Sequence, residues 1–154
     1  MNNTLNVTGE VNLKLYDEYN QLKEERTVKN LVVNNGLDYI AKRMVELNRP
    51  NEMKYMALGT SDTLASDATR NLLVAELADT RLETNAPTVT GGKVTYVRTY
   101  DPGVGTSTGI KEAGIFNTTG ITAGMLCRTT FSPIPKGSND TLTISWSITI
   151  STPV

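Results

Sequence analysis

Three residues in the C-terminal half have side chains that could do chemistry together: Glu112, Cys127 and Arg128. A carboxyl group could act as a general acid, and a thiolate could act as a nucleophile. A catalytic cysteine needs an activating neighbour, however, and the sequence contains no histidine. Glycoside chemistry needs a second carboxyl group, and the sequence fixes no such partner for Glu112. These residue types therefore favour a structural role over catalysis.

A hairpin explains the same residues more simply. The segment KEAGIFNTTGITAGMLCRTTF (residues 111–131) contains a glycine at its centre, and a turn near Gly120 would place Glu112 opposite Arg128. An opposite-charge pair on neighbouring strands contributes about 0.2–1 kcal/mol to a sheet. A small thiol packs well in a buried strand. We therefore predict a Glu112–Arg128 pair between two strands and a buried, structural Cys127.

The remaining candidate sites lack the spacing that their chemistry requires. The glycine-rich segment at residues 101–109 has no Lys-Ser/Thr ending and no helix after it, so it is not a phosphate loop. The aspartates between residues 62 and 79 lack the pattern of an EF-hand loop, so we expect neither a metal nor a cofactor. Tyr96 and Tyr100, with Arg98 between them, could stack on a sugar or a base, but core packing explains them more simply.

Alternation of apolar and polar residues predicts most of the strands. In the last one, apolar residues occupy every even position: Leu142, Ile144, Trp146, Ile148 and Ile150. The odd positions of residues 5–15 show the same period, and residues 21–33 can return as a second strand. We therefore predict a core position for Trp146 and a long N-terminal hairpin over about residues 5–33. This hairpin could project from the domain and pair with a neighbouring molecule.

One helix is predicted over residues 36–48. Asn34 or Asn35 can cap its start, and Pro50 ends it. Its apolar residues follow helical spacing: Leu37, Ile40, Ala41, Met44, Val45 and Leu47. We expect this apolar stripe to lie against a sheet or to cover one end of a sandwich. A shorter helical piece is expected between residues 62 and 77.

Length and composition place these elements in one domain. The chain has 154 residues, of which 38% are hydrophobic and 20% are charged, which favours a single globular domain over residues 1–154. About seven or eight alternating strands and one helix predict a mainly β protein, an antiparallel β-sandwich with jelly-roll-like connections. A net charge of −1 makes nucleic acid an unlikely partner. No apolar run has the length of a membrane helix, so we expect no membrane partner.

Three segments carry motifs in a suggestive order. A hairpin leads into a helix in the first segment, GEVNLKLYDEYNQLKEERTVKNLVVNNGLDYIAKRM. An Ala-Leu-Gly-Thr turn lies in the second segment, MKYMALGTSDTLASDATRNLLVAEL. The third segment is IKEAGIFNTTGITAGMLCRTTFSPIPKGSNDTLTISWSITI. It begins near Glu-Ala-Gly-Ile-Phe-Asn and ends in a Leu-x-Ile-x-Trp-x-Ile strand. This order, from about Gly9 to Ile150, resembles the small β-rich structural proteins of tailed-bacteriophage virions.

The resemblance implies a non-enzymatic virion protein that acts through protein–protein contacts and uses no cofactor. Such proteins occur as head decoration, collar, tail or fibre-base components. We expect partners among the capsid, portal, collar and tail proteins, and assembly as a homo-oligomer. We favour a capsid accessory or collar component over a tail or fibre-base component. The alternative is a carbohydrate- or receptor-binding module that uses the loops at Thr84–Gly92 and Asp101–Gly109; an enzyme is the least favoured class.

Overall fold

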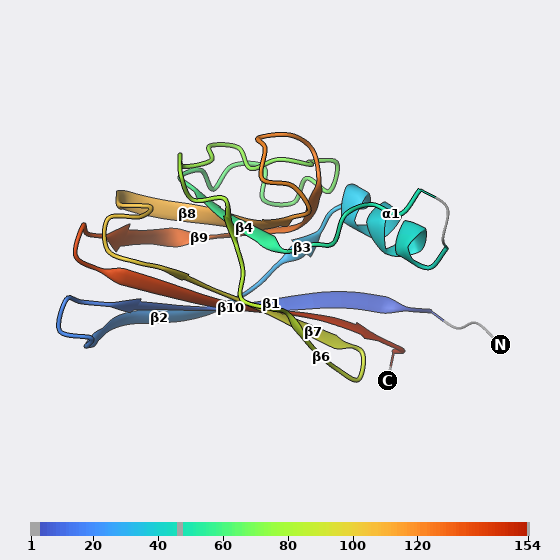
Figure 1. Cartoon of the computed structure of the whole chain (residues 1–154), viewed down its shortest axis with the longest axis horizontal. Helices are drawn as coiled ribbons and strands as arrows, with labels where there is room; N and C mark the ends of the chain where they lie inside the picture. The colour runs from blue at the N-terminus through green and yellow to red at the C-terminus, as the bar shows by residue number, and fades with distance from the viewer. Residues whose placement is uncertain (1–3, 46–47, 154) are drawn as a thin grey trace.

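Two antiparallel sheets face each other, and one short helix lies at one end of the sandwich (Figure 1). The computed structural model describes residues 4–45 and 48–153. The first sheet has the strand order β2 (Leu22–Lys29), β1 (Asn6–Tyr16), β10 (Thr141–Ser151), β7 (Lys93–Tyr100) and β6 (Thr88–Thr90). The second sheet has the order β3 (Leu31–Val32), β9 (Met125–Lys136), β8 (Ser107–Phe116), β4 (Tyr55–Gly59) and β5 (Leu82–Glu83). The predicted antiparallel β-sandwich is confirmed, with the short strands β3, β5 and β6 in addition to those expected.

The core between the sheets follows the alternation in β1 and β10. These strands pair along their whole length, from Asn6 with Ser151 to Tyr16 with Thr141. Since successive side chains point to opposite faces, one face of each strand is apolar and buried. The buried residues of the two strands are Val11, Leu13, Leu15, Leu142, Ile144, Trp146 and Ile148. Trp146 is fully buried, as its position in the pattern predicts.

The N-terminal hairpin lies within the first sheet and does not stand apart from it. β1 has β10 on one side and β2 on the other, so the predicted projection is wrong. The return strand is divided at Asn30: the residues before it form β2, whereas β3 crosses to the second sheet and pairs with β9. Arg26 in β2 also donates hydrogen bonds to the carbonyls of Ser132 and Pro133 in β9, which ties the two sheets together at this side.

The helix is shorter than predicted. α1 spans Asn34–Arg43, where residues 36–48 were expected. Its N-cap residue is Val33, which makes no capping bond through its side chain, so the predicted asparagine cap is wrong. The side chain of Asn35 instead donates a hydrogen bond of 2.9 Å to the carbonyl of Met125.

Only part of the apolar stripe of α1 faces the protein. Of its residues, Ile40 packs against the core, beside Tyr39, which is outside the stripe. The exposed residues of the stripe are Leu37, Ala41, Met44 and Val45. Leu47 lies outside the described residues. The expectation that the whole stripe covers the sandwich is therefore wrong. Gly36 explains the geometry, because it is the buried residue of the helix and faces the backbone of Leu126 so closely that a Cβ would lie 2.1 Å from the carbonyl oxygen.

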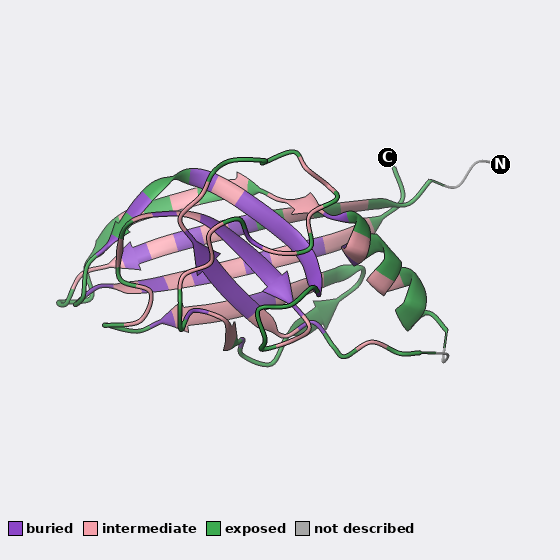
Figure 2. Ribbon diagram, turned by 90° about the horizontal axis from the view of Figure 1, so that it is seen from above, coloured by how far each residue is buried: buried purple, intermediate pink, exposed green. Residues whose placement is uncertain are grey.

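A long loop covers the outer face of the second sheet. This covering loop (residues 60–81) runs from β4 to β5 and lies over β4 and β8, where strands coloured as buried are visible beneath it (Figures 1 and 2). It contains turns and no helix, so the helical piece expected there is wrong. Leu73 of the loop joins a small apolar cluster on this face with Ala57 and Phe116. The buried outer face explains why β8 and β4 do not read as simple alternating strands.

Candidate functional site

Glu112 and Arg128 form an ion pair on the outer face of the second sheet, beneath the covering loop. The Nε of Arg128 lies 2.8 Å from Oε2 of Glu112, and the two residues are 3% and 0% exposed. They belong to neighbouring strands but are not opposite each other: Glu112 is opposite Thr130, and Arg128 is opposite Gly114. The register centred on Gly120 is therefore wrong by two residues. The pair still forms because a long arginine side chain reaches a diagonal neighbour.

Both members of the pair also bind the backbone of the covering loop. Glu112 accepts hydrogen bonds from the N–H groups of Ala75 (2.7 Å) and Val74 (3.1 Å). Arg128 donates to three carbonyls of the loop, those of Ser61 (3.4 Å), Thr63 (2.9 Å) and Leu64 (3.0 Å). The carboxylate and the guanidinium thus form their hydrogen bonds with other groups of the protein. Their arrangement fastens a loop and supports a structural role.

A second ion pair with buried side chains, which no sequence pattern predicted, fastens the other end of the loop. Arg81 binds Glu76 in a bidentate manner, with Nε–Oε1 and Nη2–Oε2 distances of 2.9 and 2.6 Å. The guanidinium of Arg81 also lies over the ring of Phe116, 3.7 Å from its centre, and donates to the carbonyl of Gly120. Bidentate geometry and aromatic stacking are the contacts that favour arginine over lysine. The sequence offered no signal beyond two opposite charges five positions apart.

Cys127 and the two candidate tyrosines are core residues. Burial raises the pKa of the Cys127 thiol well above its usual range, although a backbone hydrogen bond from Ile115 opposes this shift. Tyr100 is fully buried and donates a hydrogen bond of 2.9 Å to the carbonyl of Met56. Tyr96 is also buried, and desolvation raises the pKa of both phenols. The ring of Tyr100 is therefore not available to stack on a ligand, and Tyr96, which is 7% exposed, packs in the core as the simpler interpretation predicts.

The two segments that were predicted as carbohydrate-binding loops are partly strands. The range Thr84–Gly92 includes β6, and Asp101–Gly109 includes the first residues of β8. Within residues 4–45 and 48–153, no group of three or more cysteine, aspartate and glutamate residues is placed to hold a metal ion. The same part of the chain contains no helix with the length and apolar character needed to cross a bilayer.

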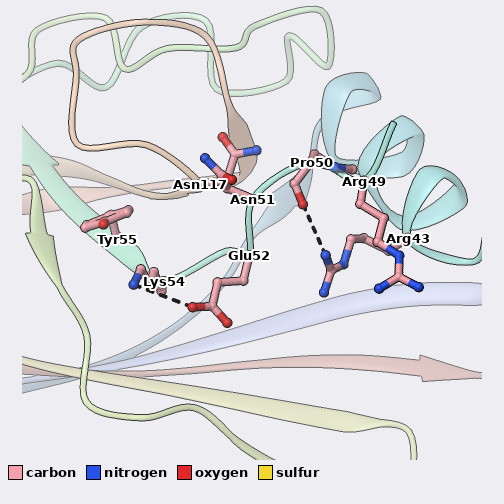
Figure 3. Close-up of a pocket in the computed structure, with 8 residues that line it drawn as sticks. All are labelled: Arg43, Arg49, Pro50, Asn51, Glu52, Lys54, Tyr55 and Asn117. Carbon is pink, nitrogen blue, oxygen red and sulfur yellow. Dashed lines mark hydrogen bonds and ion pairs between the residues drawn. The ribbon is translucent and has the colours of Figure 1, made fainter. Parts of the chain in front are cut away.

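A polar pocket lies beside the C-terminal end of α1 (Figure 3). Its cavity of about 490 Å³ is lined by Arg43, Arg49, Pro50, Asn51, Glu52, Lys54, Tyr55 and Asn117. Lys54 forms ion pairs with Glu52 (3.5 Å) and with Glu83 (3.2 Å). Arg43 donates a hydrogen bond of 3.1 Å to the carbonyl of Pro50. Amides, a phenol and charged groups around one hollow could hold a polar ligand.

An apolar groove adjoins this pocket, and we call it the helix-end groove. It has a volume of about 530 Å³ and is lined by Tyr39, Ile40, Arg43, Met44, Glu52, Met53, Pro87, Val89, Val94 and Tyr96. One wall comes from α1 and the other from the hairpin of β6 and β7, at the end of the sandwich where β1 begins and β10 ends (Figure 1). Met44 is 80% exposed and Val89 is 69% exposed. Large apolar side chains gathered around a hollow are typical of interaction sites.

The fold and these sites define a two-sheet β-domain whose buried charges hold its loops and whose exposed apolar residues surround a groove at the helix end. Comparison of the chain with protein-family models, curated proteins and solved structures found no match.

Proposed function

We propose that this protein is a non-enzymatic structural component of a tailed-bacteriophage virion and acts through protein–protein contacts. We favour an accessory or collar component of the capsid, with a tail or fibre-base component as the other station. One observation carries the proposal: the helix-end groove exposes Met44 and Val89 beside an apolar hollow. Apolar patches of this kind mark surfaces at which proteins meet their partners. The virion part of the proposal rests on the order of motifs in the sequence, which resembles that of tailed-bacteriophage structural proteins.

The chemistry of the buried residues supports the non-enzymatic part of the proposal. Glu112 is held by Arg128 and by two backbone N–H groups, so it is not placed as a free acid. The raised pKa of Cys127 keeps its thiol protonated, and the thiolate is the form that attacks substrates. These residues stabilise the sandwich and its covering loop, which gives an assembling protein a rigid body.

The test is to look for the chain in purified phage particles. Mass spectrometry of particles from the phage that encodes this sequence should detect the protein at a constant ratio to the major capsid protein. Gold-labelled antibodies should then mark the capsid or the collar. Labelling of the tail would favour the tail or fibre-base station instead. Absence of the protein from purified infectious particles would contradict the proposal.

The polar pocket supports carbohydrate or receptor binding on the virion as a second candidate function. The ring of Tyr55 and the amides of Asn51 and Asn117 line the same hollow (Figure 3). Aromatic rings and amide groups are suitable partners for a sugar. A glycan array should then show binding by the native chain that is lost in Tyr55→Ala and Asn117→Ala but kept in Tyr19→Ala, at the β1–β2 turn. No binding by the folded native chain would count against this function.

A further inference from the structure

We propose that the helix-end groove is the interface of a two-fold symmetric homodimer, in which Met44 of each copy enters the groove of the other. This inference deepens the proposed function, because it names one partner and one surface. It rests on the shape and the charges of this end of the molecule. Both can be tested on the isolated protein.

The apolar part of the surface pairs a knob with a hole. Met44 is 80% exposed on the rim of a groove whose walls include Ile40, Val89 and Val94. A methionine side chain is unbranched and adapts to irregular apolar hollows. In a two-fold contact each surface meets a copy of itself, so every knob needs its hole on the same surface. The helix-end groove meets this condition.

The charged part of the surface is self-complementary as well. Arg43 and Glu52 both line the groove and carry opposite charges. In the proposed contact Arg43 lies toward the partner's Glu52, and the two-fold axis repeats this contact with the two copies exchanged. An apolar centre with a charged rim is the usual anatomy of a protein interface. Complementary rim charges also fix the orientation in which the two copies meet.

The edges of the first sheet are less suitable for self-association. β2 carries charged residues at Lys23, Glu24, Glu25, Arg26 and Lys29, which discourage the addition of a further strand. β6 contains only three residues and follows Pro87, which has no N–H to donate to a neighbouring strand. Docking of side chains at the helix end is therefore favoured over extension of a sheet.

The experiment measures the mass of the native chain in solution by sedimentation over a wide range of concentrations. We expect a reversible dimer of about twice 16.8 kDa. Met44→Glu should weaken the dimer by at least about tenfold in Kd, or about 1.4 kcal/mol. Tyr19→Glu is the matched control, because Tyr19 is 75% exposed in the β1–β2 turn, away from the helix end, and its substitution should leave the Kd unchanged.

A charge exchange tests the orientation. Arg43→Glu and Glu52→Arg should each weaken the dimer, and the double variant should restore it, because the exchanged charges again meet as opposites. Circular dichroism and unfolding curves show that each variant is folded. A monomer at every concentration, or a dimer that Met44→Glu leaves intact, would overturn the inference. A monomeric protein still present in particles would overturn the dimer alone, and a dimer absent from particles would overturn the virion role alone.

Discussion

Arg128 reaches Glu112 diagonally across β8 and β9, since the residue directly opposite Glu112 is Thr130. The two side chains lie beneath the covering loop and also bind its backbone, through Val74 and Ala75 on the acidic side and through carbonyls such as that of Thr63 on the basic side. This pair therefore connects two strands to a loop that begins far from them in the sequence. The contribution of this pair to the stability of the fold therefore differs from that of an exposed cross-strand pair.

Removal of the cation should destabilise the fold strongly. Arg128→Met leaves the Glu112 carboxylate buried without its partner, which typically costs about 3–5 kcal/mol. The free energy of unfolding in urea should fall by this amount. Lys111→Met is the matched control, because Lys111 lies on the same strand as Glu112 and forms a half-exposed pair with Asp62 at 3.8 Å. Exposed pairs contribute at most about 1 kcal/mol, so equal losses in the two variants would contradict this prediction.

Replacement of both charges should not rescue the protein. Buried ion pairs are often replaced by apolar residues without loss of stability. In Glu112→Leu with Arg128→Met, however, two N–H groups of the covering loop lose their acceptor and three of its carbonyls lose a donor, although the carbonyl of Leu64 keeps its bond from the N–H of Asp67. We expect limited proteolysis to cut residues 60–81 faster in this double variant than in the native chain. Unchanged cleavage would show that the loop does not depend on the pair.

Gly36→Ala should destabilise the protein although alanine is the better helix former. A glycine-to-alanine change in a helix normally stabilises it by about 0.5–1 kcal/mol. Here the new Cβ would lie 2.1 Å from the carbonyl oxygen of Leu126, so α1 and β9 would have to separate. Overpacking of this kind costs about 1–3 kcal/mol, which should lower the melting temperature. The control is Gly120→Ala, where the nearest atom is 3.6 Å away and little change is expected.

The thiol of Cys127 should react only when the protein unfolds. Its side chain is fully buried, so a reagent cannot reach the sulfur in the native state. Burial also raises the pKa of the thiol, so the reactive thiolate does not form there. Ellman's reagent at mildly alkaline pH should label the protein slowly in buffer and rapidly in denaturant. Labelling of the native chain as fast as that of the denatured chain would contradict the core assignment.

Acid should weaken the protein partly through Asp140. A hydrogen bond from Lys23 (2.8 Å), followed by one from the backbone of Gly137, holds the pKa of the Asp140 carboxyl below its usual value of 3.8. A carboxyl whose pKa is lower in the folded state stabilises the fold above its unfolded pKa, and this contribution disappears as the pH falls below that value. Unfolding free energies measured toward low pH should therefore decline less steeply in Asp140→Asn. Identical slopes for the two proteins would contradict this account.

The sandwich could be predicted from local pattern because β1 and β10, at the centre of its first sheet, alternate between apolar and polar residues. In β10 the residues Leu142 to Ile148 alternate strictly, and their even positions are all buried. The charged pair of Glu112 and Arg128 could be predicted because the two residues fall on neighbouring strands of one hairpin. Its register could not, since irregularities interrupt the pairing of β8 with β9 and a single residue shifts every partner beyond it.

The amino-acid sequence by itself determined the alternating strands β1 and β10, their buried faces and the absence of an activating histidine, because these depend on residue type and on a period of two. Only the tertiary structure decided what covers those strands. The covering loop buries the outer face of the second sheet, so Glu112 and Arg128 became interior groups bonded to a distant backbone. The close approach of Gly36 to Leu126 likewise set the position of α1 and left Met44 exposed. These outcomes depend on contacts between residues far apart in the chain, which no local pattern records.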